Sequence, residues 1–438
     1  MGILEECKIT YELEQLTPML HFQGKETGAT VRASEMKPKL DRFLAEWYDK
    51  EMLEEWKLKK ENDNKDDNKE EKLPAFHYKM SIIADGRDRR GENAFYDERY
   101  FPGGYFGKVK PPYVVKHRTI KVTIICFIPE LFKKIKDIFP TFIAVTNFGM
   151  RQRMGYGCFQ VKGSDRESLM KLFVNKMNPS DILLYAIPYP NSSHGGVTVI
   201  QKLNMIKDFH QHLKSGVNFT NRRYDPFYDK SILIKEYMNP KLGDNLNEKK
   251  AMKAALAQSE IYDISSLCNI HSEHAPSEES LKKVKLTNTN IRYIRGLLGF
   301  AGQYEFRQVY RHDDRNRNRH NGIVSFQLSS NEVKRFASPI IYFPAEEKIY
   351  LIVRGDYIKN IINRNPEIKM THRKKRGSRN TEGKNQNGYV KKLTMCLPSD
   401  FDVCDFFKYV SKREVPCRAR GIHNFSYRIC NCMDEGSR

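Results

Sequence analysis

Residues 147–159 form a glycine-rich segment, NFGMRQRMGYGCF, whose residue types can hold phosphate groups. Three glycines and two arginines are interleaved in it: Gly149, Gly155, Gly157, Arg151 and Arg153. Glycine adopts positive φ and lets a ligand approach the main chain closely, while arginine supplies positive charge. We interpret the segment as a candidate anion-binding loop. The alternative, for such a segment taken by itself, is an ordinary glycine turn with two solvated arginines.

A second candidate anion site lies near the start of the chain. Residues 23–30 (QGKETGAT) contain Gly24 and Gly28 and precede a predicted helix that Ser34 can cap. Four basic residues gather at the beginning of this helix: Arg32, Lys37, Lys39 and Arg42. Because helix N-termini favour anions, this region is also suited to a phosphate.

Two groups of cysteine and histidine contain the ligand types that zinc uses. They are Cys268, His271 and His274 in CNIHSEH, and Cys417, His423, Cys430 and Cys432 near the C-terminus. Neither group has paired CxxC spacing, and the first has no fourth ligand beside it. We favour coincidence over a metal site in both cases and predict no cofactor. The sequence also lacks a Walker loop and an HExxH segment, so nucleotide hydrolysis and zinc peptidase chemistry have no support.

The composition favours a polyanionic partner. The chain has 438 residues, 39% of them hydrophobic, and its 75 Lys and Arg exceed its 54 Asp and Glu to give a formal net charge of +21. Each phosphate neutralised by such a surface releases counterions, which drives association. A basic surface without a specific partner is the alternative.

Signals for export or membrane insertion are not found in the sequence. No apolar run approaches the roughly 18 residues needed to cross a bilayer, and the first ten residues, MGILEECKIT, do not resemble a signal peptide. The nine cysteines are scattered along the chain, as in proteins whose thiols stay reduced. We therefore expect a cytoplasmic protein without membrane contact.

Hydrophobic periodicity predicts a repeating order of strands and helices in the first third of the chain. Alternation predicts strands within residues 7–22, 76–83, 118–128 and 156–161. Helical spacing follows Ser34 and again follows Pro129. The order strand, helix, strand, strand, helix, strand is typical of a split βαβ unit of the ferredoxin or RNA-recognition type.

The whole chain is predicted to be α+β, with two ferredoxin-like units whose sheets are antiparallel. We expect the first unit at residues 1–165, including a disordered charged insertion at 57–72, and a largely helical connecting region at 166–285. The second unit is expected at 286–410, with a disordered basic loop at 371–388, and a tail follows at 411–438.

The segment TPMLHFQGKETGATVRASEMKPKLDRFL resembles the first strand, glycine loop and helix start of the RAMP superfamily of CRISPR-associated proteins. NFGMRQRMGYGCF is similar to the glycine-rich loop of that superfamily, and KRFASPIIYF followed by KIYLIV is similar to a strand pair in its larger members. The resemblance extends over residues 8–161, and more loosely over 291–353.

This resemblance implies a subunit of a type III CRISPR antiviral effector complex that holds single-stranded guide RNA through its sheet face and glycine loops and contacts other effector subunits. Carried over by position, twelve residues line or flank the RNA backbone: Gly24, Lys25, Gly28, Arg32, Lys37, Lys39, Gly149, Arg151, Arg153, Gly155, Tyr156 and Gly157.

A RAMP-type endoribonuclease that processes or cleaves RNA is the alternative function. Cleavage requires a general base or a metal-holding acid near a ribose 2′-hydroxyl, and His21 and Glu26 are the candidates near the proposed groove. A histidine at a strand end is more often structural, and a glutamate in a loop is usually solvated. We therefore favour a binding protein over an enzyme.

Overall fold

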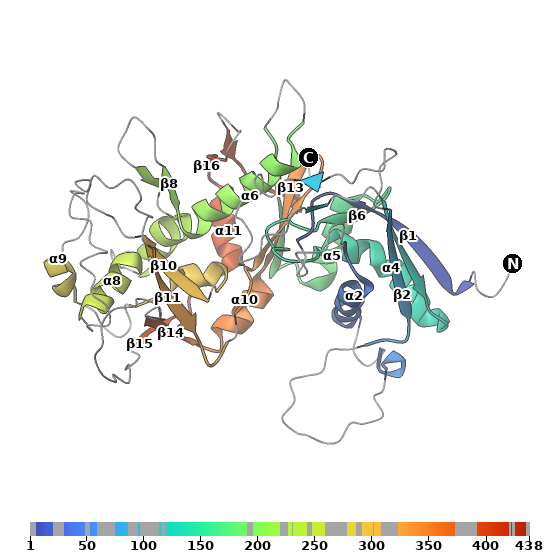
Figure 1. Ribbon diagram of the computed structural model, residues 1–438, viewed down its shortest axis with the longest axis horizontal. Helices are drawn as coiled ribbons and strands as arrows, with labels where there is room; N and C mark the ends of the chain where they lie inside the picture. The colour runs from blue at the N-terminus through green and yellow to red at the C-terminus, as the bar shows by residue number, and fades with distance from the viewer. Residues whose placement is uncertain are drawn as a thin grey trace, which may run out of the picture. The chain divides into compact units, whose positions relative to one another are not determined.

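The computed structural model describes residues 6–20, 30–48, 53–58, 75–85, 95–96, 114–115, 119–190, 196–219, 227–229, 231–242, 248–258, 278–285, 291–300, 302–307, 323–333, 335–372, 392–419, 422 and 425–434 (Figure 1). Most of the two segments expected to be disordered lies outside these ranges. Contacts divide the chain into two compact units. The first comprises Met1–Phe209, Ile340–Val353 and Val410–Arg438, and the second comprises His210–Pro339 and Arg354–Tyr409.

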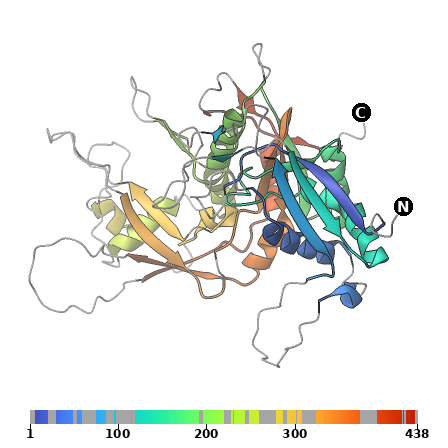
Figure 2. The ribbon, with the colours of Figure 1, turned by 45° about the vertical axis from the view of Figure 1, so that its right-hand side comes forward.

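The first unit is built on a four-stranded antiparallel sheet, and helices connect some of its strands along the chain (Figures 1 and 2). Its elements in chain order are β1 (Lys8–Gln15), α2 (Ala33–Trp47), β2 (Lys79–Asp85), β5 (Thr119–Ile125), α4 (Pro129–Ala144) and β6 (Phe159–Val161). The strands are arranged β2-β5-β1-β6, so the first and third strands lie in the centre. This arrangement confirms the predicted ferredoxin-like order for the first unit.

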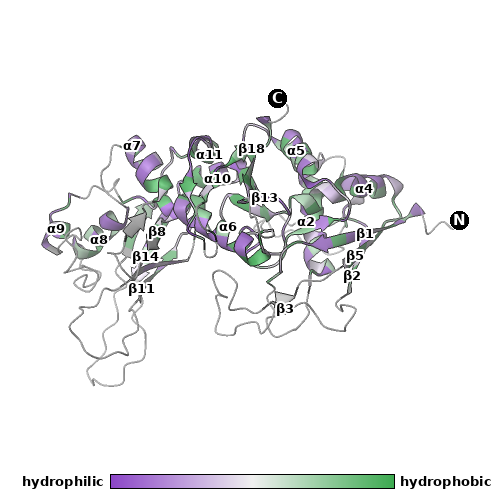
Figure 3. Ribbon diagram, turned by 90° about the horizontal axis from the view of Figure 1, so that it is seen from above, coloured by the Kyte–Doolittle hydropathy of each residue, from purple (hydrophilic) through white to green (hydrophobic). Residues whose placement is uncertain are grey.

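Alternation along the strands places one face of this sheet against the helices. Ile120, Val122 and Ile124 of β5 point into the core, whereas Lys121 between them is exposed. The ring of Tyr11 on β1 stacks on Phe139 of α4, with centroids 4.3 Å apart. Helices α2 and α4 both show hydrophobic and hydrophilic bands in Figure 3, as expected for helices that cover one face of a sheet.

The start of α2 differs from the sequence-based prediction. Arg32, in extended conformation, is the N-cap, and no side chain caps the helix. Ser34 is the second helical residue, and Glu35 is therefore the third. The backbone N–H groups of Glu35 and Met36 both donate to the carbonyl oxygen of Arg32.

A second sheet of the first unit collects strands from three distant parts of the chain. It has the order β12-β13-β7-β18, with β7 (Ile182–Pro188), β12 (Ile340–Pro344), β13 (Lys348–Arg354) and β18 (Cys430–Asn431). The sequence analysis assigned residues 340–353 to the second unit and residues 411–438 to a separate tail. They cluster instead with the first unit because β12, β13 and β18 complete the sheet around β7.

The C-terminal segment is anchored to the first unit by a buried tyrosine. Tyr427 is fully buried, and its hydroxyl donates to Asp208 Oδ2 at 2.9 Å. The backbone N–H of Arg418 donates to the same oxygen at 2.8 Å. Asp208 is 6% exposed, so these bonds compensate for removing its carboxylate from water. The segment is therefore an integral part of the unit.

The second unit has a four-stranded antiparallel sheet whose strands neighbour one another in chain order. Its strands are β10 (Gln303–Arg307), β11 (Ile323–Ser329), β14 (Glu367–His372) and β15 (Lys392–Cys396). The protein is thus α+β, and the sheets β2-β5-β1-β6 and β10-β11-β14-β15 are antiparallel, as predicted.

The remaining described elements are short strands and helices. They are α5 (Arg166–Met177), α6 (Val199–Lys214), α7 (Asn239–Leu242), α8 (Glu248–Gln258), α9 (Glu278–Lys282), α10 (Gly355–Ile362), α11 (Val403–Ser411), η1 (Glu54–Trp56), η3 (Ile232–Met238), η5 (Ile294–Leu298), β3 (Phe95–Tyr96), β4 (Val114–Val115), β8 (Val217–Phe219), β9 (Phe227–Asp229), β16 (Val415–Pro416) and β17 (Ser426–Tyr427). Within the described part of the chain, no helix combines the length and apolar character that a membrane span requires.

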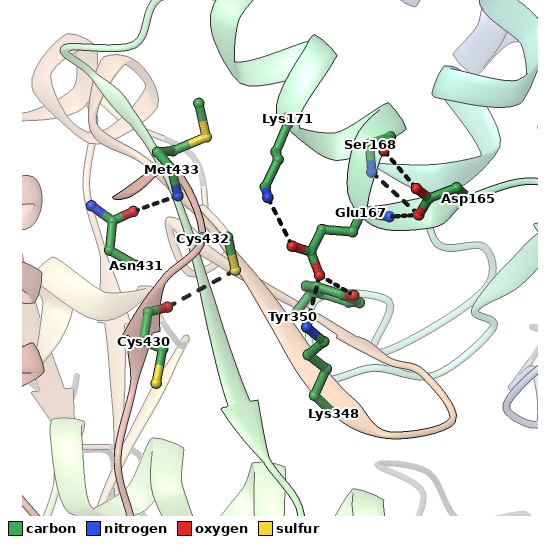
Figure 4. A network of polar contacts seen from close by, with 10 residues as sticks. All are labelled: Asp165, Glu167, Ser168, Lys171, Lys348, Tyr350, Cys430, Asn431, Cys432 and Met433. Atoms are coloured by element: carbon green, nitrogen blue, oxygen red, sulfur yellow. Dashed lines mark hydrogen bonds and ion pairs between the residues drawn. The ribbon is translucent and has the colours of Figure 1, made fainter. Parts of the chain in front are cut away.

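A polar network fastens the β12–β13 hairpin to α5 (Figure 4). Glu167 Oε2 accepts hydrogen bonds from Lys348 Nζ at 2.8 Å and from the Tyr350 hydroxyl at 2.7 Å. Glu167 Oε1 pairs with Lys171 Nζ at 2.9 Å. Partial burial raises the pKa of the Glu167 carboxyl, but the hydrogen bonds from Lys348, Lys171 and Tyr350 outweigh burial and lower the pKa to about 2.

We predict that Glu167→Gln destabilises the first unit at neutral pH and that this effect fades in acid. The folded-state pKa lies below the ordinary value, so the stabilisation is complete above about pH 4.5 and is lost as the pH falls toward 2. Urea unfolding at pH 7 should show a loss of about 1 kcal/mol after allowance for solvent screening. The exposed Glu46→Gln on α2 is the control, and a wild-type-to-Glu167→Gln difference that does not narrow between pH 4.5 and pH 2 contradicts this assignment.

Candidate functional site

The glycine-rich segment folds into a tight loop that begins and ends side by side. Asn147 and Cys158 form an isolated antiparallel bridge, and the N–H of Phe148 donates to the carbonyl of Gly157 at 2.9 Å. Gly149, Gly155 and Gly157 all have positive φ, as does Arg151 at 53°. The loop therefore has the left-handed conformations that its glycines predicted.

The space beside each glycine is occupied by the protein itself. A Cβ on Gly157 would lie 1.9 Å from the carbonyl oxygen of Phe148, and one on Gly149 would lie 2.4 Å from that of Leu20. A Cβ on Gly155 would meet Ile206 Cδ1 at 2.7 Å. These glycines thus allow the chain to approach its own main chain and core, which is a structural reason for their presence.

Lys39 of α2 fastens the loop to the helix. Its ammonium donates to the carbonyl of Asn147 at 2.9 Å, to Gln152 Oε1 at 2.8 Å and to Glu35 Oε1 at 3.0 Å. The side chain is 16% exposed and lies over the ring of Phe148. Burial lowers the pKa of Lys39 below its ordinary value, and the charge and hydrogen bond of Glu35 oppose this shift. All three donors of this ammonium are thus used within the protein.

Glu35 provides the second link between α2 and the loop. Its Oε1 atom also accepts the backbone N–H of Gly149, at 2.7 Å. The candidate helix start and the candidate glycine loop therefore meet through Glu35 and Lys39.

The opposite side of the loop is held by β12. The Nδ2 atom of Asn147 donates to the carbonyl oxygens of Gln152, at 2.6 Å, and of Tyr342, at 2.9 Å. The N–H of Tyr342 donates to the carbonyl of Arg153 at 3.2 Å, and Met154 forms a parallel bridge with Tyr342. The loop is therefore completed by a strand far along the chain.

The loop carries two charged side chains, Arg151 and Arg153, and a tyrosine, Tyr156, that contacts one of them. Both arginines are half-buried, and Tyr156 is buried. Burial raises the pKa of the Tyr156 hydroxyl to about 12, and its hydrogen bond with Arg151 opposes that shift. Burial likewise lowers the pKa of Arg151, which the same contact partly offsets. Arg151 is thus oriented by a neighbouring ring hydroxyl.

The other predicted basic residues of α2 do not all face the loop. Arg32 is exposed at the N-cap. Lys37 points elsewhere: its Nζ pairs with Asp41 at 2.9 Å and donates to the carbonyl of Phe76 at 3.1 Å. Residues two apart on a helix do not share a face, which separates Lys37 from Lys39.

Several predicted residues lie outside the described part of the chain. These are His21, Gly24, Lys25, Glu26 and Gly28 near the first strand, and Cys268, His271, His274 and His423 among the metal candidates.

The cysteines among the metal candidates that the structure describes lie in different environments. Cys430 is exposed, whereas Cys432, two residues later, is packed in the core. The Cys417 thiol donates to the Tyr427 hydroxyl at 3.0 Å. Among the described residues, no three Cys, His, Asp or Glu side chains are placed to share a metal ion.

Comparison with protein families accounts for nearly the whole chain. The Cmr1 N-terminal domain matches residues 6–217, and the Cmr1 C-terminal domain matches residues 228–426. The chain belongs to the Cmr1 family. This result confirms the resemblance to RAMP superfamily CRISPR-associated proteins that the two glycine segments suggested.

Other comparisons add little to the Cmr1 assignment. A solved structure described as "Cryo-EM structure of the Type III-B Cmr-beta bound to cognate target RNA" is similar at 14% identity with a TM-score of 0.20. The similarity covers 36% of this chain and 58% of that one, and such a score carries no argument about the fold. No curated protein matches the chain.

The sequence analysis of this Cmr1 family member missed Glu35, Gln152, Asn147 and Tyr342. The pair Glu35 and Lys39 has the (i, i+4) spacing at which opposite charges meet on a helix, so this contact was predictable. The contact of Asn147 with Tyr342 had no local signal, since the two residues are 195 positions apart.

We predict that Gly157→Ala destabilises this Cmr1 family member far more than Gly163→Ala. Both glycines have positive φ, but nothing lies within 4 Å of a Cβ on Gly163. The control should therefore lose only the conformational cost, about 1–2 kcal/mol. Gly157→Ala adds a clash with the main chain of Phe148 and should lose about 3 kcal/mol or more. Denaturant unfolding measures both, and equal losses contradict the steric role of Gly157.

Proposed function

We propose that this Cmr1 family member is a guide-RNA-binding subunit of a type III CRISPR effector complex, in which the glycine loop holds the RNA backbone. Single-stranded RNA and other effector subunits are its proposed partners. The observation that supports the proposal is that this loop of a Cmr1 family protein, which carries Arg151 and Arg153, is held by hydrogen bonds to neighbouring elements.

Rigidity of the loop favours binding of a flexible polyanion. The loop is held by α2 through Lys39, by the Pro18 carbonyl through the Gly157 N–H, and by β12 through Tyr342. A loop already fixed in position loses little conformational entropy when a ligand arrives. An arginine on such a loop can donate two parallel hydrogen bonds to one phosphate. This geometry favours specific contacts with the phosphates of the RNA backbone over a general attraction by mobile positive charges.

The outer face of the ferredoxin-like sheet favours backbone contacts over base stacking. Thr10 and Thr123, paired across β1 and β5, face outward with their hydroxyl oxygens 3.0 Å apart. Glu12 and Lys121 are paired in the next outward row, with Nζ and Oε1 3.8 Å apart. The outward residues of the described strands include no aromatic ring, whereas RNA-recognition sheets stack bases on aromatic side chains. We accordingly assign the RNA contact to the loop and not to this face.

We predict that Arg151→Glu combined with Arg153→Glu weakens binding of single-stranded RNA by about tenfold or more. Loss of two phosphate contacts should also make the dependence of log affinity on log salt shallower by about 1–1.5. Fluorescence anisotropy with labelled RNA across a salt series measures both quantities.

The matched control is Lys133→Glu combined with Lys176→Glu, because both lysines are exposed on helices of the first unit and the net charge changes equally. If the two double variants bind RNA with the same affinity, the loop is not the RNA site. A gel of the RNA recovered after each titration tests cleavage, and shortened RNA would favour the endoribonuclease function instead.

A further inference from the structure

An acidic side chain occupies the centre of the candidate phosphate site. Glu35 Oε1 lies 2.7 Å from the backbone nitrogen of Gly149 and 3.0 Å from Lys39 Nζ. One donor is thus a main-chain N–H of the glycine loop, and the other is an ammonium from α2. The Glu35 side chain is 30% exposed, so part of it is in contact with solvent.

The two donors held by Glu35 are of the kinds that bind a phosphate oxygen. Backbone N–H groups of glycine loops and lysine ammonium groups both donate short, charge-assisted hydrogen bonds to anionic oxygens. A carboxylate oxygen and a phosphate oxygen accept such bonds with similar geometry. The Glu35 carboxylate therefore satisfies the loop as a phosphate would.

We propose that Glu35 is a built-in competitor of RNA: its carboxylate occupies a phosphate position formed by the Gly149 N–H and the Lys39 ammonium, and an RNA phosphodiester displaces it. This inference rests on the proposed function. It assigns Lys39 and Gly149 as phosphate donors in the complex and Glu35 as the residue that determines how readily the position is filled.

The loop keeps its shape when Glu35 turns away. Lys39 retains the Asn147 carbonyl and Gln152 as acceptors. The loop also retains the bonds of Gly157 to Pro18, of Met150 to Leu20 and of Tyr342 to Arg153. Both donors thus stay in place after the carboxylate leaves.

The position requires an anion once Glu35 has left. Burial lowers the pKa of Lys39, and Glu35 opposes that shift. Without the carboxylate, the half-buried ammonium has lost its charged partner, so a phosphate is preferred over water.

Competition by Glu35 discriminates between ligands. A small anion must displace the carboxylate with the energy of one contact, whereas an RNA strand adds further contacts at Arg151 and Arg153 on the same loop. Internal competition thus disfavours isolated anions more than polymers.

The test uses Glu35→Asp, which keeps the net charge but shortens the side chain by one methylene and withdraws the carboxylate from Gly149. Glu46→Asp, at an exposed position of the same helix, is the control. Anisotropy with labelled single-stranded RNA should show about 3- to 10-fold tighter binding for Glu35→Asp than for Glu46→Asp. Its salt dependence should equal that of Glu46→Asp, because the same number of phosphates is contacted in both complexes and only the cost of displacing the carboxylate differs.

Glu35→Gln provides a second measurement, because its amide oxygen still accepts the Gly149 N–H while the charge is gone. It should bind RNA more tightly than Glu46→Gln, and thermal unfolding of every variant checks that the fold is retained. If neither Glu35 variant binds more tightly than its Glu46 counterpart, Glu35 is only a structural clamp and the inference is overturned.

The arginine variants separate this outcome from failure of the proposed function. Weak RNA binding by the Arg151→Glu and Arg153→Glu double variant, together with unchanged binding by the Glu35 variants, overturns the inference alone. Unchanged binding by the arginine double variant overturns the assignment of RNA to this loop and the inference with it.

Discussion

The ammonium of Lys39 is the interaction on which the geometry of the glycine loop depends. A single half-buried cation joins α2 to the loop through a backbone carbonyl, an amide side chain and a carboxylate. Each of these acceptors compensates for part of the cost of removing the charge from water. The cation therefore fixes the position of the loop, which carries Arg151 and Arg153, relative to the helix. Lys39 thus has a structural role in organising the loop.

Much of the first unit could be predicted from local sequence. Alternation in β1 and β5, with Pro129 at the start of α4, is sufficient to give the order of a ferredoxin-like sheet. The division of the chain could not be predicted in this way. Residues 340–353 look like any buried hairpin, and their association with β7 rests on pairing between strands distant in sequence. Periodicity describes which face of a strand is buried but not which strand lies beside it.

The sequence predicted where the candidate site lies better than it predicted how the site is built. The three glycines and their left-handed backbone were foreseeable, but we expected them to make room for a ligand. They instead make room for the carbonyls of Leu20 and Phe148 and for Ile206. Glycine content alone cannot distinguish these uses, because both require the same absent Cβ. Helical spacing does separate Lys37 from Lys39, so that difference was available from the sequence.

The bond between Asn147 and Tyr342 has a consequence for the order in which the protein is made. The two residues are 195 positions apart, so the loop emerges from the ribosome long before the strand that completes it. At typical rates of synthesis, the interval is about 10–40 s. During this time the Arg153 carbonyl and one of the two hydrogen bonds of the Asn147 amide lack their Tyr342 partner. The nascent chain thus carries a basic loop that is not yet complete. The loop is completed only after the β12–β13 hairpin has been synthesised and has packed against it.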